Sequence, residues 1–355
     1  MRQNNYFITL LKALFFSMII VTTSSARAEL KVVTTIKPLY SLIVNVMNGV
    51  GEPSLIIEGS TSPHSFTLKP SHAKLLEEAD LIFWVGEGIE TFMEGPLESI
   101  AKNAEVVEFM EVESIEKLKF REESIFGDHD DHDDHDDHDD HDDHDDQDDH
   151  DDHDDHDDHD DHDDHDDHDD HEDHDDHDDH AGHEGHNHGE FDAHIWLDPS
   201  NAKEMVHEIA HELGDLDPAN KDKYEANAEA TIIALDQLIK DVSKDINKDA
   251  KFVVFHDAYQ YFEERFGVRS TGALTLNTDV LPGAKQVADI QDVIKDKGIN
   301  CIFSEPQFNP KIISTIAEDT NIKTGVFDPL GANITSDKDL YFKLISNLGN
   351  ELKGC

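Results

Sequence analysis

One stretch of this chain limits its fold more than any other, an acidic and histidine-rich tract. From Asp128 to His180 the sequence repeats Asp-Asp-His with a period of three, interrupted only at Gln147 and Glu172. A period of three matches neither the 3.6-residue repeat of a helix nor the two-residue repeat of a strand, and so charged a segment cannot bury an apolar face. We therefore predict a disordered insertion at residues 127–190, with folded parts on either side.

The tract also accounts for much of the charge. The chain carries 28 basic and 82 acidic residues, a formal charge of −54, and about 35 of the acids lie between residues 128 and 180. Such a balance argues against nucleic acid as a partner, because phosphate binding needs a basic face, and it favours cations. Outside the tract and the first 28 residues about 265 residues remain, enough for two domains of common size.

The first 28 residues have the features of an export signal. Arg2 and Lys12 supply positive charge around a short apolar run at 13–21, and Ala26-Arg27-Ala28 fits a cleavage site. The run is well short of the ~20 residues that a membrane-spanning helix needs. We expect residues 1–28 to be a signal peptide and the mature protein to be soluble in a bacterial periplasm.

Two cysteines occur, Cys301 and Cys355. In an oxidising compartment such a pair favours a disulfide over two free thiols. A bridge would tie the last residue to an apolar run that we predict to be a buried strand. Closing a loop of this length is worth on the order of 4 kcal/mol.

Short β-type runs alternate with helical patterns on both sides of the tract, which predicts an α/β fold with mainly parallel sheets. Asp217-Pro218 is a good helix start, and an apolar stripe continues from Tyr224 to Ile246. We expect two α/β lobes, an N-terminal one at 29–214 and a C-terminal one at 249–355, joined by a long helix at 215–248.

Six histidines lie outside the tract, and three of them share a context. His64, His194 and His256 each stand where a strand or apolar run meets a turn, and Asp328 follows another predicted strand. Strand ends of this kind line the ligand-binding crevice of α/β sheets. One such histidine alone is more often an ordinary buried residue, but three imidazoles and a carboxylate together would suit Zn²⁺ at about 2.0–2.2 Å per bond.

A second pattern offers an alternative. The stretch from His207 to His211 reads His-Glu-Ile-Ala-His, the arrangement in which metalloproteases bind zinc and use the glutamate, here Glu208, to activate water. However, no methionine follows Met205, so no Met-turn can form, and the neighbouring apolar residues make an ordinary amphipathic helix. We predict that the protein is not an enzyme, with a secreted zinc metalloprotease or a stand-alone periplasmic metal buffer as alternatives.

Taken as a set, several motifs resemble the zinc-specific substrate-binding proteins of bacterial zinc ABC transporters, the ZnuA type within the metal-binding cluster of solute-binding proteins. The motifs are Pro63-His64 with Leu68-Lys-Pro-Ser71, Ala79-Asp-Leu-Ile-Phe-Trp-Val-Gly86, His194-Ile-Trp-Leu-Asp-Pro199, Phe255-His-Asp-Ala-Tyr-Gln-Tyr-Phe262, Ser304-Glu-Pro-Gln-Phe308 and Asp328-Pro-Leu-Gly331. The resemblance implies two lobes joined by a rigid backbone helix, with the metal in the cleft between them. It also implies a Cys301–Cys355 bridge and an insertion rich in histidine and aspartate.

The resemblance assigns the metal ligands to His64, His194 and His256. Manganese-preferring relatives typically have glutamate at the third position, so His256 indicates zinc, which suits imidazole better. Some zinc members carry a glutamate before the first ligand, where this chain has Pro63. The fourth ligand is then Asp328 or a water molecule.

The expected function is capture of Zn²⁺ by a monomer and its delivery to an inner-membrane zinc ABC permease. Because zinc binds neutral imidazole, the affinity should fall as the pH drops through about 6. We expect the tract to be a weak, multi-site zinc trap or a sensor of supply, and the alternative is an inert acidic linker.

Overall fold

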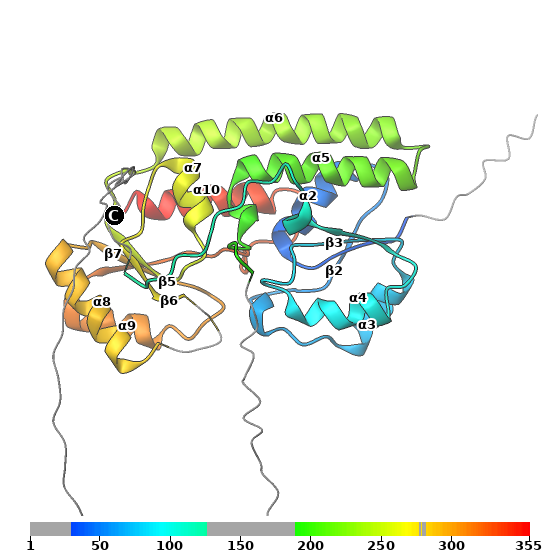
Figure 1. The fold of residues 1–355 in the computed structure, drawn as a ribbon. Coiled ribbons are helices and arrows are strands. Elements are labelled where there is room, and N and C mark those ends of the chain that lie inside the picture. Colours follow the sequence, from blue (N-terminus) through cyan, green and yellow to red (C-terminus); the bar gives the residue numbers. More distant parts are fainter. Residues whose placement is uncertain (1–29, 126–188, 277, 279–281) are drawn as a thin grey trace, which may run out of the picture. The chain divides into compact units, whose positions relative to one another are not determined.

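The computed structural model describes residues 30–125, 189–276, 278 and 282–355. The predicted signal peptide and nearly all of the tract lie outside these ranges. The described residues form two four-stranded parallel sheets with helices around them, an α/β fold with two lobes (Figure 1). None of the described helices is long and apolar enough to cross a membrane.

The first sheet has the strand order β2-β1-β3-β4. Its strands are β1 (Val32–Thr34), β2 (Ser54–Leu55), β3 (Leu81–Trp84) and β4 (Glu105–Glu108). The helices that connect them are α2 (Lys37–Val46), α3 (Pro70–Glu78) and α4 (Glu94–Ser99). Strands β1 and β3 are buried throughout, which explains why both appear in the sequence as apolar or β-branched runs.

The second sheet has the order β6-β5-β7-β8. Its strands are β5 (Phe252–His256), β6 (Gly272–Thr275), β7 (Cys301–Ser304) and β8 (Lys323–Val326). The helices of this half are α7 (Gln260–Phe266), α8 (Ala284–Lys297), α9 (Lys311–Thr320) and α10 (Leu340–Leu352). The predicted disulfide is confirmed, since Cys301 of β7 is bonded to Cys355.

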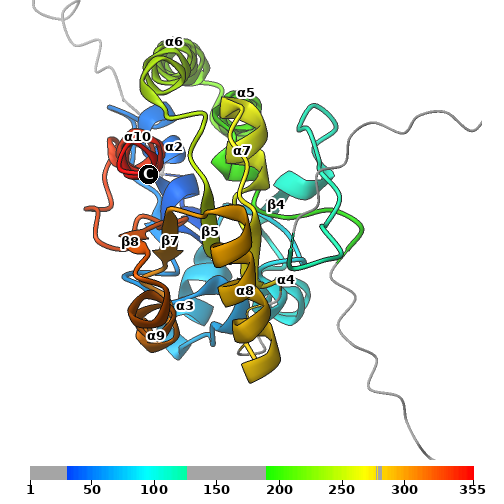
Figure 2. The ribbon, with the colours of Figure 1, turned by 90° about the vertical axis from the view of Figure 1, so that its left-hand side faces the viewer.

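Two long helices connect the halves. Helix α5 (Pro199–Leu216) and helix α6 (Lys221–Asp245) pack side by side along the top of Figure 1, and the end-on view of Figure 2 shows the same pairing. The predicted helix start at Asp217-Pro218 is wrong, because α6 begins at Lys221. The Asp217 carboxylate instead accepts hydrogen bonds from the side chains of Asn220 and Tyr224, and it thereby stabilises the turn before the helix.

The apolar core does not stop at the boundary between the halves. One contiguous cluster of buried residues includes β1 and β3 of the first sheet and also Phe252, Phe303 and Phe327 of the second half. The C-terminal helix α10 leaves its own sheet and packs on α2 and α6 (Figure 2). The two sheets are therefore held by shared packing as well as by the connecting helices.

The residues that lead into the tract form a segment that we call the entry strap, Leu118–Ile125. Although they follow the first sheet in the chain, Ile125 pairs with Gly272 at the edge of β6, and Ala273 donates its backbone N–H to the Ser124 carbonyl. Lys119 pairs with Phe191, where the chain returns. The predicted N-terminal lobe at 29–214 thus contains a segment whose end pairs with an edge strand of the second sheet.

Candidate metal centre

Three histidine rings from distant parts of the chain converge on one point. His64 lies in a short 3-10 turn (Pro63–Ser65), His194 directly precedes another (Ile195–Leu197), and His256 is the last residue of β5. Their ring centroids are 5.2–5.9 Å apart. Within the described part of the chain, these three form a group whose ligand atoms all lie within 4.8 Å of one another, close enough to share one metal ion.

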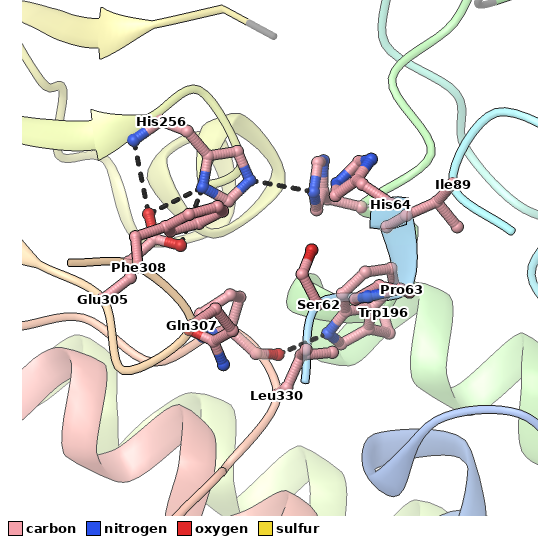
Figure 3. Close-up of a pocket in the computed structure, with 12 residues that line it drawn as sticks. Ser62, Pro63, His64, Ile89, Trp196, His256, Glu305, Gln307, Phe308 and Leu330 are labelled. Carbon is pink, nitrogen blue, oxygen red and sulfur yellow. Dashed lines mark hydrogen bonds and ion pairs between the residues drawn. The ribbon is translucent and has the colours of Figure 1, made fainter. Parts of the chain in front are cut away.

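Carboxylates fix the tautomers of the two buried rings. The Nδ1 atom of His194 lies 2.6 Å from Asp192 Oδ1. The Nδ1 atom of His256 lies 2.7 Å from both carboxylate oxygens of Glu305, as Figure 3 shows. An ionised carboxylate only accepts hydrogen bonds, so each Nδ1 carries the proton and donates it. The Nε2 atom of each ring therefore presents a lone pair to the centre.

The two Nε2 atoms of His194 and His256 face each other at 3.3 Å. Two lone pairs at this distance repel each other unless a cation lies between them. Tetrahedral zinc with Zn–N bonds of about 2.0–2.1 Å holds its nitrogen ligands roughly 3.3–3.4 Å apart. The spacing of the two rings thus matches the spacing that zinc requires.

Burial of the His256 ring and the charges around it shift its pKa in opposite directions. The ring is only 3 % exposed, and burial alone would lower its pKa. The charge and the hydrogen bond of Glu305 outweigh that effect and raise the pKa of His256 above its usual value of 6.5. A buried cation at this ring is therefore stabilised by the protein, whether the cation is a proton or a metal.

Two cavities adjoin the three rings. One has a volume of about 10 Å³, room for a single ion or water, and its walls include Ile89, Trp196 and Phe308 (Figure 3). The other has a volume of about 190 Å³ and is lined by the same three histidines together with Phe120 and Thr278. The centre thus has a tight apolar side and a side with room for several water molecules.

The fourth predicted ligand, Asp328, is not brought into the cluster. Its Oδ1 accepts hydrogen bonds from Gln307 and from the Leu330 backbone, and its Oδ2 accepts one of 2.6 Å from the Ala332 N–H. The carboxylate thus caps the loop that follows β8.

Two residues that the sequence reasoning missed are Asp192 and Glu305, which are 0 % and 3 % exposed. Glu305 stands within one of the motifs quoted above, directly after β7, so its place at a strand end was a usable signal. Asp192 precedes His194 by two residues, and only the fold shows that it turns back onto that ring.

The His-Glu-Ile-Ala-His stretch lies elsewhere. His207 and His211 are exposed on α5, and His211 contacts Glu212 at 3.0 Å rather than a shared metal position. The structure therefore offers no support for the metalloprotease alternative. His72 is partly buried, and its Nδ1 accepts a hydrogen bond from the Lys69 backbone N–H at the start of α3.

Comparisons with known proteins give the class and then the family. Among solved structures, a crystal structure of ZnuA matches with a TM-score of 0.64 and 20 % identity, covering 91 % of this chain and 98 % of that one. A ZnuA deletion mutant with bound zinc matches with the same TM-score and identity, covering 91 % and 96 %. These neighbours share the two-lobed α/β fold of this chain.

The sequence comparisons are more specific. The family described as "Zinc-uptake complex component A periplasmic" matches residues 32–355. The high-affinity zinc uptake system protein ZnuA of Brucella abortus is 47 % identical over 326 residues, 91 % of each chain, and its Yersinia pestis counterpart is 30 % identical over 346 residues, 97 % of this chain and 96 % of that one. The chain belongs to the ZnuA family of periplasmic zinc-uptake components.

Proposed function

We propose that this protein captures Zn²⁺ in the periplasm with His64, His194 and His256 and delivers it to an inner-membrane ABC permease. The observation that carries the proposal is the 3.3 Å approach of two Nε2 atoms whose rings are both oriented by buried carboxylates. Carboxylate–histidine pairs of this kind are the usual support of zinc-binding histidines.

The ligand types favour zinc over harder metals. Three imidazole nitrogens suit zinc, whereas manganese, magnesium and calcium prefer carboxylate and water oxygens. Asp192 and Glu305 lie behind two of the rings. Their negative charges offset the charge of a divalent ion in this buried place without occupying its coordination positions.

We propose a water molecule as the fourth ligand. Both oxygens of Asp328 already accept hydrogen bonds from its own loop and from Gln307, and the 190 Å³ cavity supplies space for water beside the rings. A position held by water is exchangeable, which suits a site that must pass its ion on.

We further propose that the protein acts as a monomer after removal of residues 1–28, and that nucleic acid is not a partner. The formal charge of −54 supports attraction of cations and repulsion of phosphate backbones. On this reading, cation attraction is the task of the tract, and selective binding is the task of the three-histidine site.

The test replaces His64, His194 and His256 together by Ala in a protein from which residues 127–187 have been removed. Zn²⁺ stoichiometry is measured by elemental analysis, and affinity by competition with a chromogenic chelator. We expect the parent protein to bind one equivalent tightly and the triple variant to bind none. The matched control replaces His207 and His211, which are exposed on α5, and should bind like the parent. Tight binding by the triple variant would refute the assignment.

A further inference from the structure

Asp192 is the hub of a hydrogen-bond network behind His194. Its Oδ1 accepts from both Nδ1 and the backbone N–H of His194, at 2.6 and 3.0 Å. Its other oxygen, Oδ2, accepts from the side-chain amide of Gln260 at 2.7 Å. Since the residue is 0 % exposed, these partners take the place of water around a buried carboxylate.

Gln260 has two amide hydrogens, and the structure directs both to acceptors. One is bonded to Asp192 Oδ2, and the other to the Lys119 carbonyl of the entry strap at 3.1 Å. The residue is the first of α7 and is 8 % exposed, so the helix and its packing hold the amide in place. Gln260 thus joins the strap to the carboxylate that orients a predicted zinc ligand.

The next residue of α7, Tyr261, also hydrogen-bonds the strap and residue 192, but it bonds to the backbone of Asp192 and not to the carboxylate. The hydroxyl of Tyr261 donates to the backbone carbonyl of Asp192 at 2.6 Å and accepts from the Leu118 N–H at 2.9 Å. It therefore connects the strap to the backbone of residue 192 but not to the atoms that hold the imidazole. This difference separates a role in fold stability from a role in ligand orientation.

We propose that Gln260 is a positioning residue of the zinc site, which sets the orientation of His194 through Asp192. The inference rests on the proposed function, because it assumes that His194 binds the metal. Without the amide, Asp192 Oδ2 loses a buried hydrogen bond, and the carboxylate is free to rotate toward other donors. The imidazole then loses its fixed direction, and outer partners of metal-bound histidines typically account for 10–100-fold in affinity.

The experiment compares Gln260→Met, which keeps the length of the side chain, and Gln260→Glu, which keeps its shape, with Tyr261→Phe as the control. Zn²⁺ affinity and dissociation rate are measured by chelator competition on the full chain, after the tight phase is identified in the wild type. The absorption spectrum of the Co²⁺-loaded protein reports ligand geometry, and urea unfolding of the metal-free protein reports stability. Either Gln260 variant suffices if the other fails to fold.

We expect the Gln260 variants to bind Zn²⁺ about 10-fold or more weakly, to release it faster and to show an altered Co²⁺ spectrum. Tyr261→Phe should lower stability but leave the affinity and the spectrum as in the wild type. In an Asp192→Ala background, Gln260→Met should weaken binding little further, because the two residues act in series.

Gln260 variants that lose stability but keep the wild-type affinity, release rate and spectrum would overturn the inference. So would full additivity with Asp192→Ala. A wild-type chain without a tight Zn²⁺ phase would instead overturn the proposed function itself, and the inference with it.

Discussion

Each buried histidine of the centre is supported by its own carboxylate, and the two carboxylates come from different halves of the fold. Asp192 supports His194 just before α5, and Glu305 supports His256 from the end of β7. Glu305 also accepts from the His256 backbone N–H at 3.3 Å, so one carboxylate holds both the ring and the chain. We therefore expect removal of the Glu305 charge to weaken Zn²⁺ binding.

Replacement of Glu305 by Gln tests this support. The amide keeps the size of the side chain but removes the negative charge behind His256, so we expect Zn²⁺ affinity to fall about 10–100-fold. Competition with a chromogenic chelator measures the change. Glu318→Gln, an exposed carboxylate on α9, is the control and should have no effect. Equal affinities for the Glu305 variant and the wild type would contradict the role of the carboxylate.

The pH dependence of binding follows from the same interaction. The pKa of His256 is raised above 6.5 because the charge and hydrogen bond of Glu305 outweigh the effect of burial. A proton and a metal compete for Nε2, so a raised pKa moves the onset of competition to a higher pH than for an ordinary histidine. We expect Zn²⁺ affinity to decline as the pH falls from 8 to 5.5. Calorimetry across this range should show the decline, and a flat profile would exclude protonation of the ligands.

A second pH effect concerns the stability of the fold and comes from a buried acid, Glu90. Glu90 is 0 % exposed, and its Oε2 accepts hydrogen bonds from the Val85 and Gly86 backbone N–H groups. Burial raises its pKa from 4.5 to about 7, with a further contribution from the charge of Glu108. Because the folded-state pKa is the higher one, Glu90 contributes stability at pH below about 4.5, and this contribution is lost as the pH rises through 7.

Glu90→Gln should remove that dependence. A pKa difference of about 2.5 corresponds to on the order of 3 kcal/mol. Between pH 5 and pH 8, the free energy of unfolding of the wild type should therefore fall by about this much relative to that of the variant. Urea unfolding at the two pH values gives the difference, and any pH-independent effect of the amide cancels. The exposed Glu87→Gln serves as the control. Parallel stability–pH curves for Glu90→Gln and wild type would count against a raised pKa.

At the scale of elements, helix α2 holds a loop of the other half. Lys37, the first residue of α2, is 4 % exposed, and its ammonium donates to the carbonyls of Gly331, Ala332 and Ile334. The same loop offers the Pro329 carbonyl to the indole N–H of Trp196. A single lysine thus satisfies three backbone acceptors that water reaches poorly.

Lys37→Met should lower the free energy of unfolding by on the order of 2–4 kcal/mol, because it leaves these carbonyls without their donor. Lys31→Met is the matched control, since Lys31 pairs with Glu78 in an exposed ion pair worth about 1 kcal/mol or less. Chemical unfolding of the two variants measures both values. Equal losses in the free energy of unfolding for Lys37→Met and Lys31→Met would show that the buried contacts of Lys37 stabilise the fold no more than an exposed ion pair does.

Which elements could be predicted depends on how local their signals are. Buried runs such as Leu81–Trp84 and Cys301–Ser304 show their strands in the sequence, as does the stripe of α6. Strand β6 has four residues, one of them a glycine, and it has no such signal. The entry strap was also missed, because its pairing with Gly272 depends on a partner about 150 residues away.

The same reasoning applies to the centre. The convergence of the three histidines was predictable because each stands where a strand or an apolar run meets a turn, a pattern that a single sequence displays. Glu305 also stands at a strand end, but its pairing with His256 is a property of neighbouring strands β5 and β7 that the sequence does not display. The turn of Asp192 back onto His194 likewise becomes visible only in the fold. Asp328, the alternative to water as fourth ligand, also follows a strand. In the fold its carboxylate oxygens accept hydrogen bonds from backbone N–H groups of its own loop.

At the scale of the molecule, the shared core predicts small motions on metal binding. The larger of two clusters of buried apolar residues runs through α2, α5, α6, α10 and both sheets, and separating the halves would expose part of it. We expect X-ray scattering of the protein without residues 127–187 to give the same radius of gyration, within error, with and without one equivalent of Zn²⁺. A reproducible decrease on addition of zinc would reveal a hinge that this packing does not allow.

The packing of α10 on α2 also determines when the fold can be completed. The Tyr341 backbone N–H donates to the Ser41 hydroxyl across 300 residues of sequence, and Lys37 reaches Gly331 across 294. During synthesis the apolar face of α2 therefore appears about 300 residues before its partner helix α10. Contacts of such long sequence separation form slowly. The nascent chain therefore remains incompletely folded until α10 is made, which is the state that a secretion channel can thread.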